Sequence, residues 1–132
     1  MEEPIWILEA VVHALHAEQI AEHGGSHGIR DEGLLELALT RPQNLWHYGD
    51  PAPDLAALAA SYATGVIRNH PFVDGNKRVG NVLCFLFLLL NGHDLEVRRE
   101  EEYVMFYEVA AGDRSEEELS VWIRANLAER RL

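Results

Sequence analysis

Residues 76–90 read NKRVGNVLCFLFLLL, and this stretch decides the fold. Its apolar residues fall on almost every side of a helix, which is typical of a helix that other helices enclose. The most apolar part, residues 82–90, is too short to cross a bilayer, which needs roughly 20 residues. Gly92 can adopt the left-handed conformation that ends a helix. We therefore predict a central, buried helix that begins near Asn76 and ends at Asn91.

Helical spacing of apolar residues predicts further helices on both sides of the central one. Their starts lie at or near residues that favour a helix N-terminus or a first turn, namely Pro4, Asp31, Asp54, Glu100 and Ser115. Residues 41–53 contain three prolines, and their apolar residues follow no clear helical or strand period. We therefore expect a long loop there, which could include a short hairpin. The chain is thus predicted to be a compact all-α bundle of about six helices in a single domain, residues 1–132.

The composition disfavours several classes of function. The chain has 132 residues, with 22 Asp+Glu against 11 Lys+Arg and a formal net charge of −11. This acidic balance disfavours contact with nucleic acid or with an anionic membrane, since both require clustered cations. The single Cys84 cannot form a disulfide within the chain, and the first residues lack the pattern of a secretory signal. We therefore expect a cytoplasmic protein.

The few cations are concentrated in one part of the chain. Ten of the eleven are arginines, and Lys77 is the only lysine. Residues 61–80 hold three cations against one acid, whereas residues 94–118 hold ten acids against three arginines. The cationic stretch lies where the third helix is followed by the central helix, so a small anion could be bound there.

Residues 70–78, HPFVDGNKR, carry the groups expected of a phosphate-handling site. His70 can take a proton from a hydroxyl at neutral pH. Asp74 offers the oxygen ligand that Mg²⁺ uses beside phosphate groups. A helix N-terminus follows, and its unpaired N–H groups and positive dipole end can hold an anion.

The first turn of the central helix adds to this expectation. Gly75 leaves room for a close approach and can take a positive φ. Lys77 and Arg78 place two positive charges where the helix dipole disfavours cations, which indicates that an anion binds there. Each residue alone has a simpler explanation, as a helix cap, a turn or a solvated pair. Their combination within nine residues favours a functional site.

The run at residues 70–76 resembles the signature of the Fic/Doc superfamily, His-x-Phe-x-Asp/Glu-Gly-Asn, and the Lys-Arg pair after it resembles the Doc (death-on-curing) toxin branch. Residues 24–35 are similar to the N-terminal block of the family, and residues 41–43 to the entry of its flap region. Residues 91–95 and 110–123 also fit its pattern. The resemblance implies a Fic/Doc-like helical bundle with a flap-like loop.

The resemblance also implies a role for each motif residue. His70 would be the catalytic base that activates a hydroxyl of a target protein, and Asp74 would hold Mg²⁺ on the phosphates of ATP. Phe72 would anchor the motif loop in the core. Lys77 is expected to be a second catalytic residue. The residues expected to bind the nucleotide or its phosphates are Gly75, Asn76, Lys77, Arg78 and Asn81.

Two positions depart from the adenylyltransferase form of the motif. Lys77 stands where typical Fic enzymes have glycine, and Asn81 replaces their second arginine. The resemblance to the Doc branch therefore implies a protein kinase, which transfers the γ-phosphate of ATP to a threonine of translation elongation factor Tu and so blocks translation. Two alternatives stay open, namely AMP transfer to a protein hydroxyl and a catalytically inactive protein-binding module.

The same resemblance implies a biological setting. Doc toxins belong to type II toxin–antitoxin systems, so the expected partner is an antitoxin of the Phd-like type whose flexible segment folds onto the toxin. The expected target is elongation factor Tu. We expect no contact of the toxin itself with nucleic acid and none with a membrane.

Overall fold

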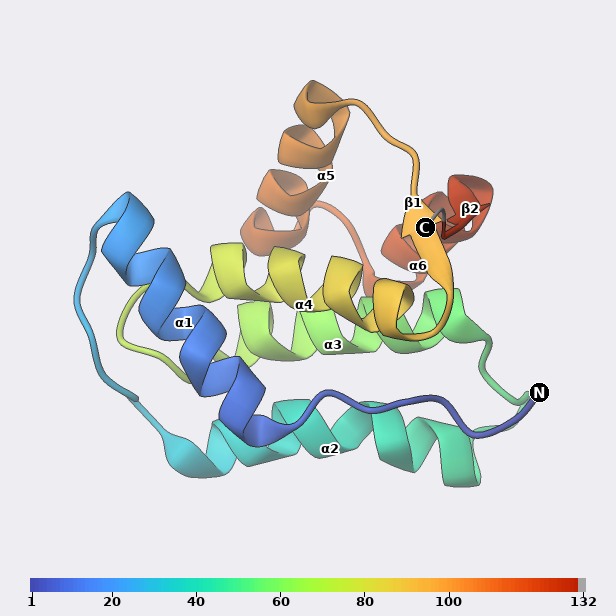
Figure 1. Ribbon diagram of the computed structural model, residues 1–132, viewed down its shortest axis with the longest axis horizontal. Helices are drawn as coiled ribbons and strands as arrows, with labels where there is room; N and C mark the ends of the chain where they lie inside the picture. Colours follow the sequence, from blue (N-terminus) through green and yellow to red (C-terminus); the bar gives the residue numbers. More distant parts are fainter. Residues whose placement is uncertain (131–132) are drawn as a thin grey trace.

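The computed structural model describes residues 1–130, which contain six helices and one small two-stranded sheet (Figure 1). In chain order the elements are α1 (Glu9–His23), α2 (Glu32–Tyr48), α3 (Leu55–Asn69), α4 (Asn76–Leu90), β1 (His93–Leu95), α5 (Arg99–Ala111), α6 (Glu116–Ala125) and β2 (Leu127–Glu129). β1 and β2 pair antiparallel, with Asp94 opposite Ala128. The predicted all-α fold of about six helices is confirmed.

α3 and α4 lie side by side at the centre, with α2 on one side and α5 on the other (Figure 1). α3 is the more enclosed of the two, because eleven of its residues are buried against seven in α4. Small residues let the neighbours of α3 approach closely. A Cβ on Gly65 would lie 3.3 Å from Cα of Ala38 in α2, and one on Gly80 in α4 would lie 2.9 Å from the carbonyl oxygen of Ala63.

The long loop predicted for residues 41–53 is wrong over its first eight residues, which continue α2 to Tyr48. Pro42 lies inside this helix and is buried there, although its ring nitrogen cannot donate the usual hydrogen bond. The helix continues because Ala38 and Leu39 before the proline and Leu45 after it follow one apolar face that packs on the core. The loop is reduced to the segment between α2 and α3.

The first helix begins later than the apolar spacing after Pro4 predicts. Residues 1–8 precede α1, and hydrogen bonds to distant residues hold part of this segment. Ile5 donates its N–H to Oδ1 of Asn91 at 2.8 Å and accepts a bond from the same amide at 3.0 Å. Ile7 donates its N–H to the hydroxyl of Tyr62. These tertiary bonds replace the local bonds that a first helical turn would make.

The predicted helix starts are confirmed at three caps. Asp31 and Asp54 accept the backbone N–H of the residue three positions on, at 3.0 and 2.9 Å. Ser115 and Glu118 form a reciprocal capping box at the start of α6. Within residues 1–130, no helix combines the length and the apolar character needed to cross a membrane.

Candidate active site

The loop between α3 and α4 starts at His70, whose backbone is left-handed. Its φ of 52° and ψ of 52° make it the one non-glycine residue with positive φ within residues 1–130. This conformation ends α3, and the N–H of His70 still donates to the carbonyl of Val66. A non-glycine residue held in this backbone conformation costs about 1–3 kcal/mol, so contacts with the surrounding structure must stabilise the conformation.

Arg30 supplies such contacts from the segment before α2. Its Nε donates to the carbonyl oxygen of His70 at 2.6 Å, and its second terminal nitrogen donates to that of Asn69 at 2.8 Å. The backbone N–H groups of Arg30 and Asp31 both donate to the carbonyl of Pro71. The guanidinium therefore covers the free carbonyl groups at the end of α3 and fixes the backbone that carries the His70 ring.

Phe72 anchors the middle of the loop in the core. Its ring is fully buried and stacks on the ring of His16 from α1, with centroids 3.9 Å apart. Nε2 of His16 donates to the backbone carbonyl of Asp74 at 2.9 Å, since a carbonyl can only accept. The side chain of Asn76 closes the turn, because its Oδ1 accepts the N–H of Phe72 and its Nδ2 donates to the carbonyl of the same residue. Asn76 is thus left with its backbone N–H to offer to a ligand.

The start of α4 has free hydrogen-bond donors. Gly75 takes φ 81° at the N-cap, where no side chain caps the helix. The first hydrogen bond of the helix runs from Val79 to Gly75, and no acceptor within residues 1–130 faces the N–H groups of Asn76, Lys77 and Arg78. Three adjacent N–H groups at the positive end of a helix can bind a phosphate.

Asp74 holds its carboxylate at the edge of this turn. Oδ2 accepts the N–H of Ser26 at 3.1 Å, and Oδ1 accepts the N–H of Gly75 at 3.1 Å. Gly25 permits this approach, because a Cβ there would lie 2.8 Å from Oδ2. The carboxylate is otherwise exposed and keeps free lone pairs, so it fits a Mg²⁺ ion whose other ligands are phosphate oxygens and water. No cluster of three or more His, Cys, Asp or Glu within residues 1–130 offers a site built from protein ligands alone.

One cavity of about 360 Å³ brings most of the predicted site residues together. His70 lies at one part of its wall, Asp74 and the first turn of α4 form another, and Ala110 of α5 also lines it. This volume is within the range of small-molecule sites. The predicted site residues that line the cavity are His70, Asp74, Gly75, Asn76, Lys77 and Arg78.

Arg78 and Asn81, two of the residues predicted to bind the nucleotide, make contacts outside the cavity. The guanidinium of Arg78 lines the cavity and also donates to the carbonyl groups of Gln19 and Gly24, at 3.3 and 3.1 Å, where α1 ends. Asn81 does not line this cavity. It lines a separate, mostly apolar one between α1 and α5, where its Nδ2 donates to Oε1 of Glu102 at 3.0 Å.

The sequence predictions do not include Arg30 or His16 as site residues. Both lie more than 35 positions before the motif that they contact, so spacing gives no signal for them. The one available signal for Arg30 is its place in residues 24–35, which resemble a block of the family.

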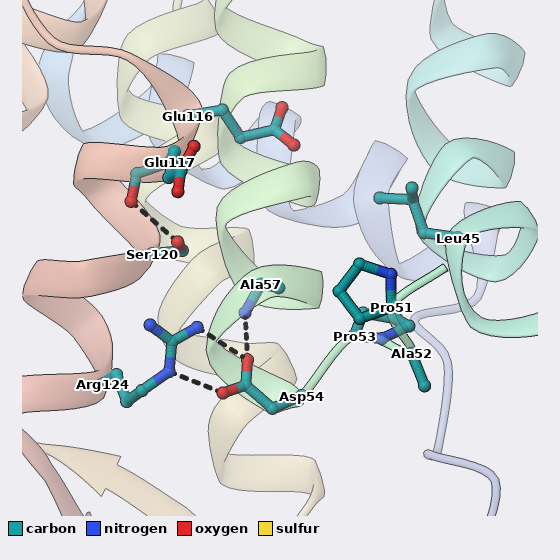
Figure 2. A pocket seen from close by; sticks show the side chains of 10 residues that line it. All are labelled: Leu45, Pro51, Ala52, Pro53, Asp54, Ala57, Glu116, Glu117, Ser120 and Arg124. Carbon is teal, nitrogen blue, oxygen red and sulfur yellow. Dashed lines mark hydrogen bonds and ion pairs between the residues drawn. The ribbon is translucent and has the colours of Figure 1, made fainter. Parts of the chain in front are cut away.

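A second cavity, of about 400 Å³, lies at the opposite end of α3, on the order of 20 Å from the first along the helix. Figure 2 shows Arg124 and Asp54 facing one another on one side of it, where Arg124 binds Asp54 through two hydrogen bonds. Glu116 is bound by Arg41 and by the hydroxyl of Thr64. Among the described residues that line this cavity none is histidine, lysine or cysteine, and two of its carboxylates, Asp54 and Glu116, are bound by arginines.

Comparison with known proteins shows the family of the chain. Residues 6–88 match the Fic/DOC family, and this range includes His70 and the first turn of α4. A relative from Mycolicibacterium smegmatis (strain ATCC 700084 / mc(2)155), named Toxin Doc, is 39% identical over 94 residues, which cover 68% of this chain and 71% of the relative. The chain belongs to the Fic/Doc family.

Proposed function

We propose that this chain is a Doc-like toxin, a protein kinase that transfers the γ-phosphate of ATP to a hydroxyl of a target protein. Membership of the Fic/Doc family implies a nucleotide-dependent transferase that modifies proteins, and the similarity to a protein named Toxin Doc supports the toxin assignment. The observation that carries the proposal is the single cavity in which His70, Asp74 and the free N–H groups of α4 meet.

His70 is proposed as the general base. His70 lines the cavity, and Arg30 binds its backbone carbonyl, which fixes the position from which the ring extends. It would take the proton of the target hydroxyl while that oxygen forms a bond to the γ-phosphorus. The bond from phosphorus to the bridging oxygen breaks at the same time, and ADP leaves with its electron pair.

The phosphates would be bound at the start of α4. The N–H groups of Asn76, Lys77 and Arg78 would donate to phosphate oxygens, and the side chains of the last two would neutralise charge. Asp74 would hold Mg²⁺, which supplies further neutralisation when bound. Asn81 is not part of this cavity, which leaves the role first expected for it without geometric support.

The proposed target is a threonine of elongation factor Tu, and the proposed antagonist is an antitoxin of the Phd-like type acting in the cytoplasm. Both follow from the resemblance to the Doc branch. A chain that modifies an abundant translation factor must be restrained, and a second protein that covers the cavity would do so.

The proposal is tested by incubating the protein with purified elongation factor Tu, Mg²⁺ and ATP labelled at either the α or the γ position. We expect label on the target from γ-labelled ATP alone. Label from α-labelled ATP would show AMP transfer instead. Label from neither, with folded protein, would favour a binding module without transferase activity.

The base is tested with His70→Ala, which should lower kcat by about 10²–10⁴-fold, the usual contribution of a positioned base. His47→Ala is the matched control, because His47 is an exposed histidine in the last turn of α2 that does not line the cavity. An active and toxic His70→Ala variant would exclude His70 as the base.

A further inference from the structure

α5 brings two tyrosines beside the only lysine of the chain. Tyr103 and Tyr107 are one helical turn apart, and their rings stack with centroids 6.2 Å apart. The Lys77 Nζ lies 5.4 Å from the centroid of the first ring and 5.3 Å from that of the second. Both distances are within the range of roughly 6 Å at which a ring face attracts an ammonium. One cation thus interacts with two aromatic rings at once.

The core does not account for these tyrosines. Tyr103 is 64% exposed and Tyr107 is 55% exposed, whereas α5 packs inward through Met105, Phe106 and Val109. The two rings therefore contribute little to the buried core of the protein. Their position next to Lys77 needs another explanation.

Within residues 1–130 the Lys77 ammonium forms no ion pair and donates no hydrogen bond. Its electrostatic contacts are the cation–π interactions with the two rings. This holds although the first turn of α5 carries Glu100, Glu101 and Glu102. An ammonium paired with a carboxylate would have to break that pair before it bound a phosphate. An ammonium held by ring faces keeps its charge and its three donors for an incoming anion.

The tyrosines also lie beside the cavity that contains His70. Lys77 lines this cavity, and so does Ala110, which is three residues after Tyr107 on the same face of α5. We propose that Tyr103 and Tyr107 are positioning residues, which hold the Lys77 ammonium at the cavity wall where it binds the phosphates of the nucleotide. This inference rests on the proposed function, because it assumes that ATP binds in this cavity.

The inference predicts that the aromatic faces matter and the hydroxyls do not. The double variant Tyr103→Leu/Tyr107→Leu keeps an apolar, helix-favouring side chain but removes both rings. It should raise KM for ATP about five- to tenfold with kcat little changed, since two exposed ring contacts are lost. The variant Tyr103→Phe/Tyr107→Phe keeps the ring faces and should retain the original KM. Tyr48→Leu is the matched control, because Tyr48 is 83% exposed at the end of α2 and does not line the cavity.

A second readout does not depend on catalysis. Protein labelled with ¹³C- and ¹⁵N-lysine gives a single set of lysine side-chain NMR signals, because Lys77 is the only lysine. Ring currents should shift its Hε signals upfield in the unchanged protein and in the Phe variant, but not in the Leu variant. ATP with Mg²⁺, titrated into the unchanged protein, should move the same signals.

The outcomes separate the two proposals. Unshifted Hε signals in the unchanged protein, or ATP affinity in the Leu variant equal to that of the unchanged protein, would overturn the positioning role. Absence of any transfer from labelled ATP by the unchanged protein would overturn the proposed function instead. In that case the lysine signals and the ATP affinity of the tyrosine variants, measured by calorimetry, still decide the role of the two rings.

Discussion

Arg30 determines whether the proposed base is held in place. It contacts the carbonyl groups of Asn69 and His70 through two nitrogens of one planar group, which a lysine cannot imitate. Arg30→Lys should therefore lower kcat about tenfold while KM for ATP changes little, since Arg30 does not contact the turn proposed to bind phosphate. Steady-state kinetics measure this split, and a histidine-ring NMR spectrum reports whether His70 has become mobile.

The control for this prediction is Arg98→Lys. Arg98 is 83% exposed and makes one loose pair with Glu101, so its replacement should change neither kinetic constant. Equal loss of activity in both variants, or a larger effect of Arg30→Lys on KM than on kcat, would contradict the positioning role of Arg30.

The residues of the site differ in how far sequence alone could predict them. His70, Asp74 and Lys77 are close neighbours in the chain, so one turn brings them to the same cavity, and their chemistry indicates a common purpose. The partners of these residues are distant in sequence. Neither the Arg30 contact nor the Tyr107 ring beside Lys77 could be predicted, because each depends on how separate helices pack.

At the scale of elements, the crossing of α3 and α4 depends on Gly80. A Cβ there would lie 2.8 Å from Cγ1 of Ile67 and 2.9 Å from the backbone oxygen of Ala63, which cannot move without shifting α3. Gly80→Ala should therefore destabilise the protein by about 1–3 kcal/mol, although alanine favours a helix more than glycine does. Urea unfolding followed by circular dichroism measures the change.

Gly33→Ala provides the comparison, because its nearest new contact, at 3.3 Å, is with a single side-chain atom, the capping Oδ1 of Asp31, and not with the backbone of another helix. The helix preference of alanine should offset part of the disturbance of this cap, so we expect a smaller loss of stability than for Gly80→Ala. A Gly80→Ala variant as stable as the unchanged protein would show that the two helices can move apart at no cost.

The helices themselves are largely predictable, apart from the late start of α1 and the continuation of α2 past Pro42. Caps such as Asp54 and the apolar spacing are local signals, so they predict starts and faces well. Pro42 is also a local signal, and it indicates a break that does not occur. The packing of the helix face around Pro42 outweighs the lost hydrogen bond, and that packing cannot be read from residues 41–53 alone.

Arginines join distant parts of the whole molecule. Arg124 of α6 binds Asp54 at the start of α3, and Arg41 of α2 binds Glu116 at the start of α6. In a chain of net charge −11, such pairs offset part of the repulsion among the acids. The net charge, known from the sequence, argues against a broad polyanion-binding surface. The sequence does not predict which acids pair with an arginine.

The pair of Asp54 and Arg124 makes stability depend on pH. The hydrogen bond from Arg124 lowers the pKa of Asp54, so the folded state holds its proton less tightly than the unfolded state. The stabilisation is therefore present above the unfolded pKa of about 3.8 and is lost as the pH falls through the lower folded value. Asp54→Asn keeps an N-cap residue but removes the charge, and should cost about 0.5 kcal/mol at pH 7, since the pair is half-exposed.

This difference should shrink below about pH 4, where the unfolded chain already binds the proton. Urea unfolding of both proteins at pH 7 and pH 3 tests the change. Asp113→Asn is the control, because the Asp113 carboxylate makes no ion pair or hydrogen bond within residues 1–130. A stability difference for Asp54→Asn that is the same at both pH values would contradict the role of the pair.

The Lys77 ammonium is also the only side-chain amine that chemical reagents can address in this protein. An acylating dye or cross-linker that targets lysine can react with one side chain only, which lies over two aromatic rings and beside the cavity of His70. A protease specific for lysine has a single cleavage site, and cutting there separates the motif loop from the rest of α4. Covalent labelling and limited proteolysis at lysine, which in most proteins sample the whole surface, therefore report here on one turn of one helix.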